Sequence, residues 1–141
     1  MAIDGSKLEV PNSKENRKIF GNSGNQHSKI RQVRALVSGM YDILNHFYLD
    51  IQIAHISVSE NELAKQNLEH LKEVAMEQPI IAIFDRGYPS IEFIDFLETK
   101  GIHYLFRLSS NDYIAERRQM KTEDEMVILR HSSSRLQKTR I

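Results

Sequence analysis

The chain of 141 residues contains no cysteine and no tryptophan, and it has only three prolines. The lack of cysteine excludes a disulfide framework, thiolate metal ligands and a cysteine nucleophile. No basic stretch followed by an apolar run opens the sequence, and no window approaches the roughly 18 apolar residues of a membrane-spanning helix. We therefore expect a protein without a visible secretion signal and without a membrane partner.

The sequence also lacks an excess of charge of either sign, because 19 Lys and Arg balance 19 Asp and Glu. Bulk charge therefore favours no class of partner, and any basic surface must come from local clustering. Apolar residues make up 40% of the chain, which is typical of a globular protein rather than a disordered one. The length predicts one compact domain.

The first half of the chain shows the pattern of extended strands. Residues Met1–Val10 alternate loosely and predict a strand that stops at Pro11. Val33–Leu44 and Phe47–Ile56 are apolar-rich segments separated by two polar residues, which predicts a β-hairpin. The stretch between, Asn16–Arg34, predicts a basic loop.

The second half alternates between helical and extended patterns. Ser59 and Glu62 form a capping box that predicts a helix start, and the apolar residues that follow recur at helical spacing on one face. The continuous apolar run Ile80–Phe84 predicts a strand buried on both faces. A second helix is expected from Ser90 through Lys100.

The final elements complete an α/β fold. Gly101 suits the left-handed position after the second helix, and His103–Leu108 predicts another strand. Met126–Leu129 predicts one more short strand. This order predicts a mixed sheet in which an antiparallel three-strand meander precedes a helix, a strand, a helix and a strand.

Two aspartates are the candidate site. Asp85 follows the apolar strand Ile80–Phe84, at the carboxyl edge where open α/β sheets bind ligands, and Asp4 lies in the first strand. In a mixed sheet of this order the two strands can be neighbours. Paired carboxylates offer the hard oxygen ligands that suit Mg²⁺ or Mn²⁺, and such ions support phosphoryl transfer. Read separately, each aspartate also fits an ordinary turn.

Basic residues gather in the segment Asn16–Arg34, which contains no acid. Lys and Arg neutralise phosphates, so this segment predicts a DNA contact, although a solvated loop explains it equally well. The candidate DNA-binding residues are Lys18, Lys29, Arg31 and Arg34, together with Arg86 beside Asp85.

Two segments carry a family resemblance. Ala2–Ser6 and Ile83–Ser90, the latter containing Asp-Arg-Gly-Tyr after a strand, resemble the DDE transposases of bacterial insertion sequences, specifically the IS4-type group. The resemblance covers residues 2–112 and implies an RNase H-like core. It also implies that Asp4 and Asp85 are the first two catalytic, metal-binding aspartates, which hold Mg²⁺ or Mn²⁺ for cutting transposon ends and joining them to target DNA.

The third carboxylate of that family is not matched here. It is a Glu in a Tyr-x-x-Arg-x-x-x-Glu pattern, and no such pattern follows Tyr113, the last tyrosine. We therefore expect a truncated fragment, with a partial catalytic core at 1–112 and the start of a β-rich insertion and polar tail at 113–141. Such a fragment would be incomplete at both ends, bind the ion weakly and be inactive alone.

The resemblance further implies DNA as partner, a homo-oligomer in the intact enzyme and a place in the bacterial cytoplasm. Two other readings stay open. One is a non-catalytic DNA-binding or interfering fragment of a transposase. The other is a phospho-acceptor signalling domain with Asp85 as the acceptor, although such domains begin with a strand-helix unit and adjacent acids, whereas this chain begins with one acid and a hairpin.

Overall fold

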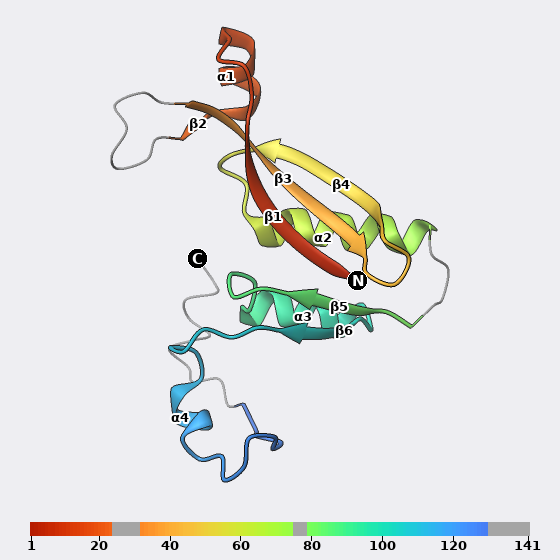
Figure 1. The fold of residues 1–141 in the computed structure, drawn as a ribbon, viewed down its shortest axis with the longest axis vertical. Helices are drawn as coiled ribbons and strands as arrows, with labels where there is room; N and C mark the ends of the chain where they lie inside the picture. Colours follow the sequence, from red (N-terminus) through yellow and green to blue (C-terminus); the bar gives the residue numbers. More distant parts are fainter. Residues whose placement is uncertain (24–31, 75–78, 130–141) are drawn as a thin grey trace.

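The computed structural model describes residues 1–23, 32–74 and 79–129. Within these ranges six strands and four helices alternate along the chain, and Figure 1 shows their arrangement. The strands are β1 (Ala2–Glu9), β2 (Asn22–Ser23), β3 (Gln32–Asp42), β4 (Phe47–His55), β5 (Ile81–Phe84) and β6 (His103–Phe106). The helices are α1 (Lys14–Phe20), α2 (Glu60–Val74), α3 (Ile91–Thr99) and α4 (Ile114–Arg117).

The strands form one mixed sheet, which confirms the predicted α/β class. Its order is β2-β3-β1-β5-β6, and β4 pairs with the other side of β3. The pairs β1–β3 and β3–β4 are antiparallel, whereas β1–β5 and β5–β6 are parallel. The predicted hairpin is therefore present, and the two crossovers through α2 and α3 add parallel strands on the far side of β1.

Both long helices cover the same face of this sheet. Figure 1 shows α2 behind β1, β3 and β4, and α3 behind β5 and β6. A single apolar cluster joins the sheet to the helices, with Ile3 and Phe84 from the strands, Leu68 from α2, and Phe93 and Leu97 from α3. Each of these side chains is no more than 1% exposed. The predicted apolar face of α2 is confirmed. On α3 the buried residues are Phe93 and Leu97, whereas Ile91 and Ile94 are only partly buried.

The prediction that Ile80–Phe84 is buried on both faces is wrong. Ala82 and Phe84 lie in the core, but Ile81 is 59% and Ile83 36% exposed. The reason is that both crossover helices pack on one side, so the described residues leave the other side of β5 uncovered. Further exposed apolar side chains on this open face are Ile51, Ile53 and Leu105.

Side-chain caps fix the helix starts as the sequence predicts. The amide of Glu62 donates to Ser59 Oγ at 3.2 Å, and the amide of Phe93 donates to Ser90 Oγ at 3.2 Å. Satisfying these amides removes part of the cost of starting a helix. Gly101 follows α3 with φ of 66°, a conformation that glycine adopts without steric cost.

Two other expectations need correction. The stretch Asn16–Arg34 is not a continuous loop, because Ser13 caps α1 by accepting from the amide of Asn16 at 3.1 Å, and β3 begins at Gln32. Met126–Leu129 forms no strand in the described part of the chain. None of the helices within the described ranges is long and apolar enough to cross a membrane.

A buried polar network ties α2 to the hairpin. Asn67 is 0% exposed; its side-chain oxygen accepts from Ser38 Oγ at 2.7 Å, and its side-chain nitrogen donates to Asp50 Oδ2 at 2.9 Å. Asp50 also accepts from Gln52 at 2.8 Å, and His70 Nδ1 lies 3.4 Å away. Burial raises the pKa of Asp50, but the hydrogen bonds from Gln52, Asn67 and His70 outweigh it, so the pKa is lowered.

This lowered pKa predicts an acid-sensitive contribution to stability. A carboxyl whose pKa is depressed by folding stabilises the native state above its unfolded pKa, near 3.9, and loses that effect as the pH falls through the folded value. Asp50→Asn should therefore lower the free energy of unfolding by about 1–2 kcal/mol at pH 6 and by much less at pH 2. Urea unfolding across this range measures it, with exposed Glu73→Gln as control, and a pH-independent difference would contradict it.

Candidate functional site

The parallel pairing of β1 with β5 brings the two predicted aspartates to neighbouring strands. Ala2 is in register with Ile83, and the amide of Ile83 donates to the carbonyl of Met1 at 2.9 Å. Two residues further along each chain, Asp4 in β1 lies alongside Asp85, the residue that follows β5. Segments 81 residues apart in sequence thus supply one acidic pair.

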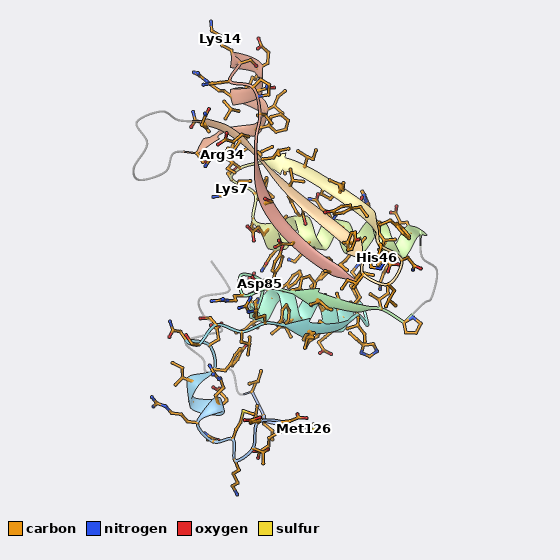
Figure 2. All side chains as sticks on the ribbon, viewed as in Figure 1. Lys7, Lys14, Arg34, His46, Asp85 and Met126 are labelled. Carbon is orange, nitrogen blue, oxygen red and sulfur yellow. The ribbon has the colours of Figure 1, made fainter. Side chains whose placement is uncertain are left out.

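The alternation of side chains places both carboxylates on the open face. Ile3 and Phe84, the preceding residues, are each 1% exposed and point into the core. Because successive strand residues point to opposite faces, Asp4 and Asp85 project from the face that α2 and α3 do not cover. Both residues are exposed, and Figure 2 shows Asp85 at the end of β5.

Arg107 is the cation next to this pair. Its backbone amide donates to the carbonyl of Phe84 at 3.0 Å, which fixes the residue after β6 beside the end of β5. Its Nη1 lies 3.6 Å from Asp85 Oδ1, with both side chains more than half exposed. Such a pair contributes little to stability but places a positive charge where an ion or a phosphate would bind. The sequence predictions assigned Arg107 no role.

Glu60 lies close to both aspartate-bearing segments from the helix side. A Cβ built on Gly5 would be 2.7 Å from Glu60 Cγ, so only glycine leaves room for this side chain. A Cβ built in the same way on Gly87 would lie 3.7 Å from Glu60 Oε2. The sequence predictions assigned Glu60 no role, and a signal that could have pointed to it is a glycine soon after each aspartate.

The phenol of Tyr88 lies among these acids. The side chain is 1% exposed and packs on Phe84 with ring centroids 5.2 Å apart. Burial is the main cause that raises the pKa of Tyr88, followed by the negative charge of Glu60. The charges of Asp4 and Asp85 raise this pKa further. The backbone amide of Gly5 lies close enough to the hydroxyl to lower its pKa by hydrogen bonding, but the opposing causes are larger. Three acids from three segments therefore act on one buried hydroxyl.

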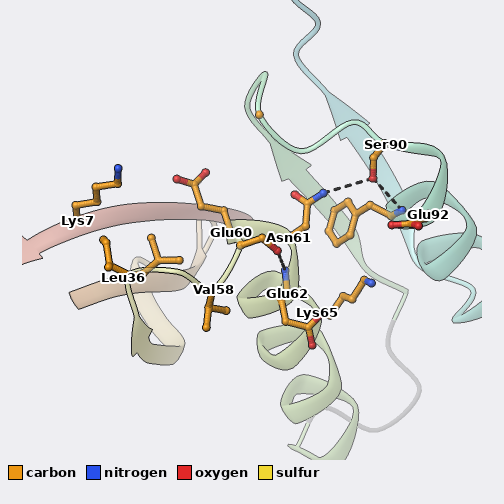
Figure 3. Close-up of a pocket in the computed structure, with 13 residues that line it drawn as sticks. Lys7, Leu36, Val58, Glu60, Asn61, Glu62, Lys65, Ser90 and Glu92 are labelled. Atoms are coloured by element: carbon orange, nitrogen blue, oxygen red, sulfur yellow. Dashed lines mark hydrogen bonds between the residues drawn. The ribbon is translucent and has the colours of Figure 1, made fainter. Parts of the chain in front are cut away.

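A cavity of about 520 Å³ opens beside the start of α2, on the helix side of β1. Figure 3 shows Glu60 beside β1 and Asn61 pointing toward Ser90. The charged side chains that line the cavity are Lys7, Glu60, Glu62, Lys65 and Glu92. Neither Asp4 nor Asp85 lines this cavity.

Among the described residues, one predicted DNA-binding residue lies beside the acidic pair: Arg86 is exposed directly after Asp85. Lys18 is exposed on α1. Arg34 forms an ion pair with Glu9 at 2.7 Å, which neutralises much of its charge. Lys29 and Arg31 lie outside the described residues.

The donor set fits a divalent ion in part. Asp4 and Asp85 present carboxylate oxygens, the ligand type that Mg²⁺ and Mn²⁺ prefer. Within the described ranges no three His, Cys, Asp or Glu side chains are arranged to hold a metal ion. Asp4 and Asp85 thus offer two carboxylate ligands, whereas a site for phosphoryl transfer needs more than two ligands.

Comparison with known families identifies the class. A family model described as a transposase DDE domain matches residues 1–140, almost the whole chain. The chain therefore belongs to the DDE transposase domain family. Neither the curated proteins nor the solved structures gave a match.

The position of Arg107 predicts an effect on cation binding. Its guanidinium repels a divalent ion at Asp85, so Arg107→Gln should tighten Mn²⁺ binding about two- to threefold, a small change because both side chains are exposed. Arg118→Gln, at an exposed arginine that ends α4 as its C-terminal cap, is the matched control. Electron paramagnetic resonance of free Mn²⁺ measures the change, and unchanged or weaker binding would refute it.

Proposed function

We propose that this chain is the catalytic segment of an IS4-type DNA transposase, built on an RNase H-like core, in which Asp4 and Asp85 bind Mg²⁺ or Mn²⁺. The observation that supports this most is the placement of these two aspartates on adjacent parallel strands and on one open face. The strand order, with an antiparallel unit followed by two parallel strands, suits the same fold.

The residues have distinct roles in this proposal. Asp4 and Asp85 would hold the ion, and a bound ion would supply positive charge for the reacting phosphate and for the attacking hydroxyl. Arg107 balances Asp85 in the free protein and contacts the phosphate of bound DNA. The exposed Arg86 lies beside Asp85 and contacts the DNA backbone.

Two carboxylates do not complete such a site. A third acidic ligand is needed to fix two ions for an in-line displacement, and the described open face supplies no group of three. We infer that this chain alone binds the ion weakly and does not cut DNA. From the family resemblance we infer that residues 1–112 form the core and 113–141 the start of an insertion. We further propose that the intact enzyme acts as a homo-oligomer on transposon ends in the bacterial cytoplasm.

Ion binding should depend on both aspartates. Asp4→Asn and Asp85→Asn should each abolish the rise in melting temperature that millimolar MnCl2 causes, because a single exposed carboxylate retains a divalent ion poorly. Asp95→Asn, an exposed aspartate on α3, should keep the rise. Thermal unfolding with and without Mn²⁺ measures this directly.

The proposal fails if either asparagine variant responds to Mn²⁺ as the wild type does. A plasmid-nicking assay in Mn²⁺ should show no cleavage above background by the chain alone. If the wild-type chain cuts DNA and both variants do not, only the predicted inactivity of the chain is wrong. If Asp85→Asn cuts DNA as well as the wild type does, the assignment of Asp85 to the site is wrong.

A second candidate function is DNA binding without cleavage. The exposed lysines Lys14 and Lys18 on α1 favour it, at the far end of β1 from Asp85 in Figure 2. Each neutralised phosphate contributes about 0.9 to the slope of log affinity against log salt. Lys14→Gln with Lys18→Gln should lower that slope by about 2 for duplex DNA. Binding that does not respond to salt would exclude this function.

A further inference from the structure

The first turn of α2 is in contact with both segments that carry the aspartates. Glu60 Cδ lies 2.9 Å from where a Cβ on Gly5 would be, directly after Asp4. Asn61 donates from its side-chain amide to the carbonyl of Tyr88 at 3.2 Å and to Ser90 Oγ at 3.4 Å. One helix turn therefore touches β1 and the loop after β5 together.

Glu60 cannot be a ligand of the ion itself. Gly5 faces the helix side of β1, as its contact with Glu60 shows, whereas Asp4 projects from the opposite face. Consistent with this, the described residues contain no group of three acids able to coordinate one ion. Glu60 can act on the site only through its charge and through the backbone it contacts.

The charge of Glu60 is not neutralised by a close partner. Among the described residues no cation lies within 4 Å of its carboxylate. The nearby buried hydroxyl of Tyr88 makes no hydrogen bond to it. Lys7 and Lys65 line the adjoining cavity without forming an ion pair with Glu60.

We propose that Glu60 is a positioning residue of the Asp4–Asp85 site, which holds Gly5 and the loop at Gly87 and adds a third, non-ligating negative charge beneath the bound ion. This inference rests on the proposed function. In the free protein the charge repels both aspartates, and in the ion-bound protein it attracts the ion. The same group therefore destabilises one state and stabilises the other.

Glu60→Gln removes the negative charge and keeps the size and shape of the side chain. The dissociation constant for Mn²⁺ should increase about three- to tenfold, because the charge that attracts the ion is lost. The melting temperature of the metal-free protein is no test, because relief of repulsion among the acids is offset by loss of a favourable charge in the first turn of α2. A purely structural role would leave the affinity unchanged. Glu60→Asp restores the charge and should recover most of the affinity.

Glu62→Gln is the matched control, since Glu62 is exposed in the same helix turn and lines the same cavity. It should change the affinity for Mn²⁺ less than 1.5-fold, as expected for a screened surface charge. Equal effects of Glu60→Gln and Glu62→Gln would overturn the proposal. So would an unchanged affinity in Glu60→Gln.

A pair of glycine variants tests the contact independently. Gly5→Ala would place its Cβ 2.7 Å from Glu60 Cγ and must displace that side chain, whereas Gly87→Ala meets only an ordinary contact at 3.7 Å. We expect Gly5→Ala to weaken Mn²⁺ binding and Gly87→Ala to leave it within twofold. Equal affinity in the two variants would count against the positioning role.

Asp85→Asn, measured in the same titration, separates the two proposals. If Asp85→Asn abolishes Mn²⁺ binding while Glu60→Gln leaves it unchanged, only the role of Glu60 is wrong. If wild-type binding does not depend on Asp85, the proposed function and this inference both fail.

Discussion

The parallel contact between β1 and β5 is the constraint on which the rest of the structure depends. It joins the antiparallel unit of β1, β3 and β4 to the parallel pair β5 and β6. Its register, with Ala2 opposite Ile83, is also what sets Asp4 beside Asp85. A slip by one residue would turn one of the two carboxylates into the core face, because side chains alternate between faces. The same register therefore determines both the packing of the sheet and the geometry of the acidic pair.

Coverage by helices on one face separates the core from the site. α2 and α3 bury Ile3, Phe84 and their neighbours, so stability is concentrated on that side. The other side keeps the two acids exposed, together with apolar residues such as Ile81 and Leu105. Glu60 connects the two sides: it begins a helix of the covered face, yet it contacts the glycine that follows Asp4. The chain belongs to the DDE transposase domain family, and we propose the exposed acidic pair as its ion site.

Local patterns predicted much of this arrangement. Ser59 and Ser90 are helix caps as expected, the hairpin strands lie where alternation placed them, and Asp85 follows its strand. What local patterns missed depends on tertiary contacts. The run Ile80–Phe84 looks buried on both faces, but burial is set by where the helices pack. Glu60 looks like a solvent-facing helix residue, and only the absence of a side chain at Gly5 allows its contact with β1. The short helix α1 was missed because its residues are mostly polar.

The central claim is that Asp4 and Asp85, from segments far apart in sequence, share one divalent ion. A crystal of the chain soaked in MnCl2, with anomalous diffraction recorded for manganese, tests it most directly. The account predicts one anomalous peak on the open face, within about 2.0–2.4 Å of a carboxylate oxygen from each aspartate. A peak that contacts only one of them, or a peak elsewhere with none at the pair, would contradict it.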